Sequence, residues 1–382
     1  MAPVAWRNLP LRFLYFGLFY LIISAFLGIL NVFGYSFKPV HSHLMLAGFV
    51  SLTIVGSMYQ LVPTVTGTEL RMRGVAELSF YLLNAGLVML LAAFFGVFPF
   101  SISGAVYFLG ALAFAAVVFV TLLDMKLRSV AVPFFGAAIL FHLAGILYAT
   151  LGFIGTIPFR VAVHNHLLTA GWIGLTTFGG LYELFPMLAL RKLRSQSAAW
   201  FTFPLATLSL VVMLYGLQSG QESLVSAGGA GYAASFVLMV VNLLATLASK
   251  SDTPAPLDIS VKFFVPALFF GLAGIFVGLM SVERFLHSHL MLVGWITLTI
   301  IGAEYHIIPM ITWMEKYSEK LGIEDVPMIG DLFNLRLGEV LLALSVIGTV
   351  MLLLPQVRAL GGVLLLAVFV AFSYDMVMVQ RR

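Results

Sequence analysis

Long apolar stretches alternate with short polar connections along the whole chain. About twenty consecutive apolar residues are enough to cross a membrane as a helix, and about twelve stretches reach that length. We expect these spans at residues 12–34, 38–63, 75–97, 102–124, 131–155, 159–188, 197–219, 225–248, 260–282, 283–311, 333–355 and 358–378. The longest polar connection, MEKYSEKLGIEDVPMIGDLFN, follows the tenth span and is expected to form a surface helix or loop. The pattern predicts an all-α polytopic membrane protein, a single membrane domain over residues 1–382.

The composition supports this fold class and narrows the chemistry. Of the 382 residues, 61% are hydrophobic and 9% charged, whereas a soluble domain has about 25% charged residues. The formal net charge of +4 does not indicate a nucleic-acid partner, because the basic residues fall in the connections. The chain has no cysteine, which excludes thioether-attached heme, thiolate iron–sulfur clusters and a thiolate copper centre within it. Histidine is therefore the main candidate metal ligand.

The distribution of Lys and Arg predicts the orientation in the membrane. The side that contains both termini holds 16 of these residues, and the opposite side holds 4, namely Lys38, Arg160, Arg284 and Arg358. We therefore expect a multi-pass protein of the cell membrane with both termini in the cytoplasm. The apolar run after the basic N-terminus is too long for a signal peptide, so it is expected to remain as the first span.

Three stretches of 23 residues align without a gap. They are HSHLMLAGFVSLTIVGSMYQLVP from His41, HNHLLTAGWIGLTTFGGLYELFP from His164 and HSHLMLVGWITLTIIGAEYHIIP from His287, at offsets of 164 − 41 = 123 and 287 − 164 = 123. Nine columns are identical in all three, including both histidines. The equal offsets predict three four-helix repeats, at about 1–125, 126–250 and 251–382, arranged with pseudo-threefold symmetry. Helix packing alone would explain the glycine columns, but histidines inside membrane spans are costly and are usually functional.

The two histidines of each stretch are two residues apart, so on a helix their side chains point about 200° apart. Each helix would then contribute one imidazole to each of two neighbouring sites, and three helices would form up to three sites with two facing imidazoles. A porphyrin ligated on both faces fits such a gap, whereas a single zinc or copper ion requires more ligands. The six candidate ligands are His41, His43, His164, His166, His287 and His289.

Two further groups of residues recur beside the histidines. At 100° per residue, Gly48 lies near the direction of His41, so the glycine column Gly48, Gly171 and Gly294 either leaves room for a flat ligand or allows close helix contact. One cation precedes each pair, namely Lys38, Arg160 and Arg284. These cations either bind outward-facing heme propionates or extend to the membrane interface.

The stretch HSHLMLVGWITLTIIGAEYHIIPMI resembles the tenth transmembrane helix of heme–copper oxidase subunit I, above all the cbb3-type oxidases and nitric oxide reductases. The shared features are HxH, a GW pair five residues after the second histidine, and G-x-x-Y-H-x-I-P. KPVHSHLMLAGF resembles the second helix of that family, and VHNHLLTAGW falls where its sixth helix carries a copper ligand. The resemblance implies a low-spin heme b between His41 and His289, His287 as the ligand of a second heme, and His164 as a copper ligand.

The chain departs from that family at the copper site. The resemblance would require an adjacent His-His pair after the seventh helix, and this chain has no His-His; it has Tyr215 and Glu222 in that region instead. Copper is therefore not expected. The additional histidines His43 and His166 would complete two further pairs, His43 with His164 and His166 with His287. One heme b is thus expected at His41/His289, and up to three in the chain.

The remaining polar residues of the spans give weaker signals. His142 and His306 are expected to be structural, and the carboxylates Glu77, Asp124, Glu183, Glu304, Glu339 and Asp375 all fall near cytoplasmic ends, so strong proton pumping is not expected.

The leading interpretation is a membrane cytochrome b that transfers electrons near the outer face, to or from quinol or an outer-face electron carrier, with partner subunits or oligomers left open. An oxidase or nitric oxide reductase with an altered metal site, a heme-based gas-responsive protein and a threefold-repeat transporter are the alternatives. The sequence therefore indicates oxidoreductase-like chemistry and leaves enzymatic activity open.

Overall fold

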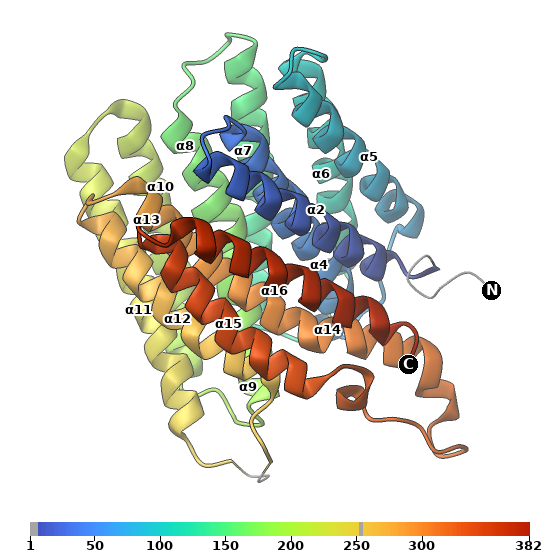
Figure 1. The fold of residues 1–382 in the computed structure, drawn as a ribbon. Helices are drawn as coiled ribbons and strands as arrows, with labels where there is room; N and C mark the ends of the chain where they lie inside the picture. Colours follow the sequence, from blue (N-terminus) through green and yellow to red (C-terminus); the bar gives the residue numbers. More distant parts are fainter. Residues whose placement is uncertain (1–6, 252–254) are drawn as a thin grey trace. The chain divides into compact units, whose positions relative to one another are not determined.

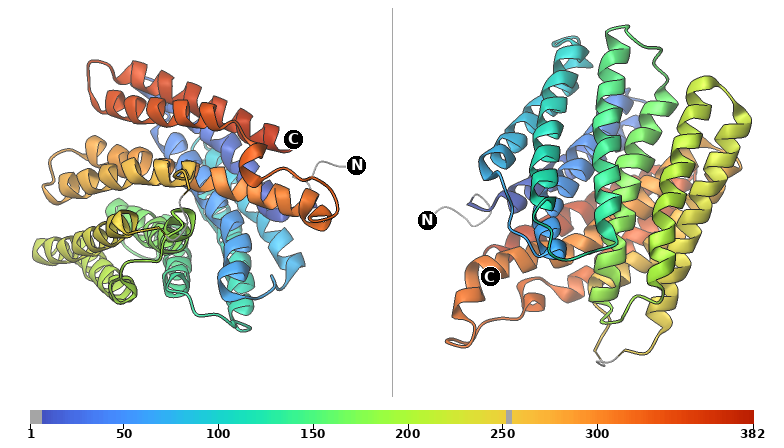
Figure 2. Two further views of the ribbon diagram at one scale, coloured as in Figure 1. Left: turned by 90° about the horizontal axis from the view of Figure 1, so that it is seen from below. Right: turned by 180° about the vertical axis from the view of Figure 1, so that it is seen from behind.

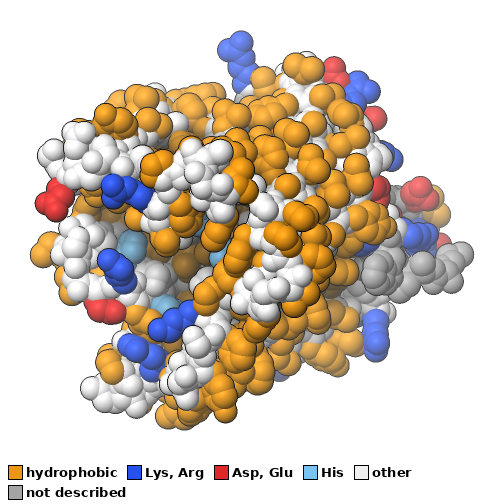
Figure 3. Space-filling view, turned by 90° about the horizontal axis from the view of Figure 1, so that it is seen from above, with side chains coloured by type: hydrophobic (Ala, Val, Ile, Leu, Met, Phe, Trp, Pro, Cys, Tyr) orange, Lys and Arg blue, Asp and Glu red, His pale blue; other side chains and the backbone are white. Residues whose placement is uncertain are grey.

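The computed structural model describes residues 7–251 and 255–382. The regular elements of these residues are helices, and eleven of the helices are long and apolar enough to cross a membrane. The all-helical class and the multi-pass membrane character predicted from the sequence are therefore confirmed. Hydrophobic side chains make up most of the surface in the space-filling view (Figure 3), as expected where lipid replaces water as the solvent.

The helices follow the predicted spans closely (Figure 1). Their bounds are α2 (Leu9–Val32), α3 (Lys38–His43), η1 (Leu44–Val50), α4 (Ser51–Thr66), α5 (Arg73–Ala93), α6 (Phe100–Leu122), α7 (Ala131–Phe153), α8 (Val161–His166), η2 (Leu167–Gly174), α9 (Leu175–Leu188), α10 (Gln196–Ser219), α11 (Glu222–Ala248), α12 (Ile259–Leu279), α13 (Arg284–His289), η3 (Leu290–Thr297), α14 (Leu298–Tyr317), α15 (Leu335–Leu353) and α16 (Arg358–Val379). The polar connection after the tenth span forms two short 3₁₀ helices, η4 (Ser318–Lys320) and η5 (Ile329–Leu332).

Three long helices are each built from three consecutive elements, α3–η1–α4, α8–η2–α9 and α13–η3–α14. These are the histidine-bearing helices, and in each of them a π-helical segment begins directly after the second histidine. A π-helical turn has i→i+5 hydrogen bonds and is found frequently at functional sites. Because its turn is wider than an α-helical turn, a uniform count of 100° per residue fails across it. The angular relation that we expected between His41 and Gly48 assumed such a uniform count, so it stays a prediction.

Side-chain hydroxyl groups bond to main-chain carbonyls inside the π-helical segments. Ser51 Oγ donates to Leu46 O at 2.7 Å, and Thr297 Oγ1 donates to Leu292 O at 2.7 Å, both across five residues. In η2 the same column is Gly174, and a hydroxyl from another helix bonds to this segment instead, since Tyr232 OH donates to Ala170 O at 2.8 Å. The π segments are thus held by specific polar contacts.

The described residues divide into two compact units. Unit 1 comprises the described residues up to Ser57, together with Leu257–Gly274 and Glu283–Arg382, and unit 2 comprises Met58–Pro256 and Ile275–Val282 as far as they are described. In unit 1, α2 packs against α3, η1 and α16, and α15 pairs with α16. In unit 2, α5 pairs with α6 and α10 pairs with α11, as both views of Figure 2 show. The boundaries of the units differ from those of the three predicted repeats, which stay a prediction.

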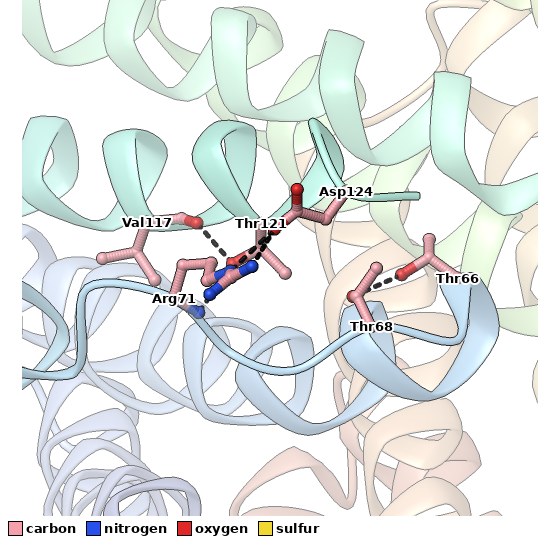
Figure 4. A network of polar contacts seen from close by, with 6 residues as sticks. All are labelled: Thr66, Thr68, Arg71, Val117, Thr121 and Asp124. Atoms are coloured by element: carbon pink, nitrogen blue, oxygen red, sulfur yellow. Dashed lines mark hydrogen bonds and ion pairs between the residues drawn. The ribbon is translucent and has the colours of Figure 1, made fainter. Parts of the chain in front are cut away.

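In unit 2, the connection between α4 and α5 is tied to the end of α6 (Figure 4). Arg71 donates its backbone N–H to Thr121 Oγ1 at 3.2 Å, and its side chain forms an ion pair with Asp124, with Nε 2.7 Å from Oδ2. The hydroxyl groups of Thr66 and Thr68 are 2.9 Å apart in the same connection. These contacts lie at the opposite end of the histidine-bearing helix from His41.

Similar contacts occur at two other places. The backbone N–H of Arg194 donates to Thr246 Oγ1 on α11 at 2.9 Å, and the backbone N–H of Asn334 donates to Asp375 Oδ1 on α16 at 3.2 Å. In each case the start of one helix is bonded to the end of the next, which fixes how the two helices pair.

Candidate functional site

The six predicted ligands lie in the short α-helical segments α3, α8 and α13, at the start of the three long helices. All six side chains are partly buried, and histidine side chains reach the surface close to Lys and Arg side chains in the space-filling view (Figure 3). The segments have α-helical geometry, so the two imidazoles of each pair leave the helix in directions about 200° apart.

The first histidine of each pair is bonded to the helix that precedes it in the chain. In all three cases Nδ1 lies within hydrogen-bond distance of a main-chain carbonyl oxygen on that helix. The contacts are His41 to Ser24 O at 2.8 Å, His164 to Gly145 O at 3.2 Å and His287 to Gly274 O at 2.8 Å. The acceptors lie on α2, α7 and α12, respectively.

The second histidine of each pair is bonded within its own helix. Its Nδ1 contacts the carbonyl oxygen four residues earlier in the chain. The contacts are His43 to Pro39 O at 2.8 Å, His166 to Ala162 O at 2.8 Å and His289 to Phe285 O at 2.9 Å. The two imidazoles of each pair thus have different anchors, as expected from their opposite directions.

These contacts fix the tautomer of all six rings. A carbonyl oxygen can only accept a hydrogen bond, so Nδ1 must carry the hydrogen in each contact. In the neutral ring the lone pair is then on Nε2, the nitrogen farther from the backbone. Histidines that bind metals usually donate their other ring N–H to a carbonyl in this way, which orients the ring and makes the ligating nitrogen more basic.

His41 and His289 form the one predicted pair whose members both belong to unit 1. They come from different helices, α3 and α13, and lie near each other. His41 also packs against α2, because a methyl group added at Gly28 would lie 3.0 Å from His41 Cε1. The other two predicted pairs, His43 with His164 and His166 with His287, combine residues of different units and stay predictions.

His289 is part of a stack that the sequence did not reveal. The ring of Phe285 is stacked on the His289 ring, with centroids 3.8 Å apart and planes at 25°. Arg358 lies over the ring of Phe285, with Cζ 3.9 Å from the centroid, and its Nε donates to Leu352 O at 3.2 Å. In the sequence Arg358 was recognisable only as one of four basic residues on the predicted outer side.

The three cations that precede the pairs lie at the N-terminal ends of their helices. Lys38 and Arg284 are the first residues of α3 and α13, and Arg160 precedes α8. Their side chains are exposed, so they remain available to an anionic group near the histidines or to the membrane interface.

The glycine column provides close contact between helices. A methyl group at Gly171 would lie 2.7 Å from Phe141 Cβ on α7, and one at Gly294 would lie 2.6 Å from Phe270 Cβ on α12. Gly48 is buried as well. At Gly171 and Gly294 the space beside the glycine is filled by a phenylalanine, which favours the packing interpretation.

The remaining histidines are placed as follows. His142 is 2% exposed, and its ring is stacked on Trp172, with centroids 4.3 Å apart. Its Nδ1 has no hydrogen-bond partner, and the stacking on Trp172 packs this ring against the neighbouring helix. His306 is partly buried on α14. Across residues 7–251 and 255–382, no three His, Asp or Glu side chains gather in a way that could hold a metal ion.

The comparisons with known proteins give no family assignment. No family model matches the chain. An uncharacterized protein of Aquifex aeolicus (strain VF5) is 29% identical over 304 residues, which cover 76% of this chain and 75% of the relative. This similarity spans most of both chains but carries no information on activity.

Proposed function

We propose that the chain is a membrane cytochrome b of the heme–copper oxidase superfamily, with a heme b held between His41 and His289. The observation that carries the proposal is the pair itself. Two imidazoles from different helices lie near each other in unit 1, and each donates Nδ1–H to a main-chain carbonyl, so that Nε2 is the ligating atom. No hydrogen bond to Nε2 of either ring occurs among the described residues.

Heme supplies one-electron redox chemistry when it is bound, and the axial ligands and nearby charges set its potential. The chain would contribute three things. Ser24 and the Phe285 carbonyl orient the two rings, Phe285 covers one face of His289, and Arg358 adds a positive charge beside it. A nearby cation stabilises the reduced, more negative form of a redox centre.

The proposal includes the finer features that the sequence predicts. The three repeats would have pseudo-threefold symmetry, the equivalent pairs would allow up to three hemes, and both termini would be cytoplasmic. The hemes would then lie near the outer face, where quinol or an outer-face carrier is the electron donor or acceptor. The exposed cations Lys38, Arg160 and Arg284 would bind the propionates.

The test is the amount of heme per chain, measured as pyridine hemochrome against protein mass. We expect between one and three hemes, with the sharp reduced bands of low-spin heme b. His41→Ala and His289→Ala should each remove one heme, whereas His306→Ala, on α14 away from the pairs, should remove none. A purified protein without reduced heme bands would contradict the proposal, and a carbon monoxide shift would favour an oxidase or reductase with an altered metal site.

A further inference from the structure

Glu304 on α14 is the most deeply enclosed acidic residue of the described chain. Its side chain is 0% exposed, and it lies in unit 1. Oε1 accepts one long hydrogen bond, from Thr53 Oγ1 at 3.4 Å, and Oε2 has no hydrogen-bond partner. Asp375, the other buried carboxylate of the described residues, differs because it accepts the backbone N–H of Asn334.

The negative charge of an ionised carboxylate in this position would have no countercharge beside it. An ionised group that is removed from water without a countercharge costs several kcal/mol or more, and in practice it is neutralised by a proton or a cation. No ion pair to Glu304 occurs among the described residues. The hydroxyl group that bonds to its carboxyl group is that of Thr53, which carries no charge.

The other two copies of this helix show what the position requires for packing alone. The residues equivalent to Glu304 are Met58 and Leu181, so an apolar side chain fills the column elsewhere. The threonine column differs too. Thr176 and Thr299 donate to the carbonyls four residues earlier in their own helices, each at 2.7 Å, whereas the hydroxyl of Thr53 donates to Glu304. The contact between a carboxyl group and a threonine hydroxyl group therefore occurs once, at Glu304 and Thr53, and is not repeated at the equivalent positions.

Polar side chains lead from Glu304 to one end of unit 1. Tyr15 on α2 lies near Glu304, and its hydroxyl group donates to Met376 O at 2.9 Å. Gln380 Nε2 donates to Thr312 Oγ1 at 2.6 Å, and Lys316 Nζ donates to Gln380 O at 2.6 Å. Lys316 is close to the end of α14, on the side that the Lys and Arg distribution assigns to the cytoplasm.

We propose that Glu304 binds an exchangeable proton that reaches it from the Lys316 end of unit 1 by way of Tyr15. Each proton that leaves the carboxyl group is replaced by one from solvent at that end. A metal cation is the alternative counterion, but sodium or calcium needs about six oxygen ligands. The carboxyl group and the one hydroxyl group that bonds to it supply three oxygens, two from Glu304 and one from Thr53.

The proposal goes beyond the function proposed above and can be tested without heme. The protein, reconstituted in liposomes, is moved from H2O to D2O at neutral pH while its infrared spectrum is recorded by attenuated total reflection. We expect a protonated-carboxyl C=O band that shifts slowly in D2O. Glu304→Gln should remove this band, and Asp375→Asn should leave it in place. A band that persists in Glu304→Gln, or a wild-type spectrum without a protonated-carboxyl band, overturns the proposal.

The route is tested by the rate of the same shift. Tyr15→Phe should slow the exchange at least tenfold, whereas Tyr59→Phe, which removes a buried hydroxyl bonded to Ser79 in unit 2, should not. An unchanged rate in Tyr15→Phe overturns the route. Glu304→Leu introduces leucine, the residue found at the equivalent position Leu181, and controls for folding. This variant should elute from a size-exclusion column as the wild type does. A protonated-carboxyl band that disappears when sodium is added would show that the site binds a cation. This result would overturn the proposal that Glu304 binds a proton.

Discussion

Replacing Arg358 by leucine should lower the midpoint potential of the heme that we propose for His41 and His289. Arg358, Phe285 and His289 form one stack in unit 1, with the guanidinium 3.9 Å from the Phe285 centroid and that centroid 3.8 Å from the His289 centroid. The guanidinium is therefore a fixed positive charge beside one proposed axial ligand. A positive charge favours the reduced state, so its removal favours the oxidised state and lowers the potential.

The magnitude follows from the same distances. The guanidinium and the His289 ring are at most about 8 Å apart, and two unit charges at that distance interact by about 2 kcal/mol at an effective dielectric constant of about 20. Arg358 is partly exposed, and screening by solvent reduces this value to about 1 kcal/mol. For a one-electron couple, about 1.4 kcal/mol corresponds to about 59 mV. We therefore expect a decrease on the order of 40 mV, and at most about twice that.

The assay is a spectroelectrochemical titration of the reduced heme band in the purified protein. Arg358→Lys keeps the charge and should recover most of the potential. Arg284→Leu removes an exposed cation from the start of the same helix as His289 and should have a smaller effect. A potential for Arg358→Leu within about 10 mV of the wild type would refute the reasoning, because it would mean that the guanidinium does not act on this heme.

Two further predictions concern the stability of the fold and use the thermal unfolding midpoint in detergent. Gly294→Val should destabilise by about 1–3 kcal/mol, because its Cβ would lie 2.6 Å from Phe270 Cβ, whereas Gly180→Ala, with no atom within 4 Å of the added methyl group, should stabilise slightly. Equal midpoints for the two variants would contradict the packing argument. Arg71→Met should cost less than about 1 kcal/mol, because the side chains of Arg71 and Asp124 are 56% and 46% exposed; a loss as large as that of Gly294→Val would show that this ion pair holds the α4–α5 connection.

The apolar pattern was sufficient to predict the helices, because a membrane requires each spanning segment to satisfy its own backbone and to be apolar along its length. Each predicted span coincides with a helix, and the largest difference in a boundary is at the end of α14, predicted at residue 311 and observed at Tyr317. The segment at 159–188 is a continuous helix but is not among the eleven most apolar ones. Its polar residues, among them His164, Asn165, His166 and Glu183, lower its hydropathy without preventing a helix.

The histidine pairs could be predicted from spacing, but their surroundings could not. The side chains of residues that are two apart on an α-helix point in nearly opposite directions. The different hydrogen-bond partners of His287 and His289 agree with this. The π-helical segments were not predictable, because a count of residues per turn assumes that the turn is uniform. The role of Gly294 was left open for a related reason. Only the position of Phe270 decides whether the space beside a glycine is empty or filled.

The sequence placed Glu304 with the carboxylates at cytoplasmic ends, since its position along the span is closer to that end than to the histidines. Depth along a helix, however, does not determine access to water. In the structure the carboxyl group faces Thr53 and has no contact with solvent, while Glu183, two columns further along the repeat, is partly exposed. A titratable group enclosed among neutral neighbours needs a reason to remain there, because Met58 and Leu181 fill the same column. The difference between the three copies, rather than their similarity, therefore points to the proton site.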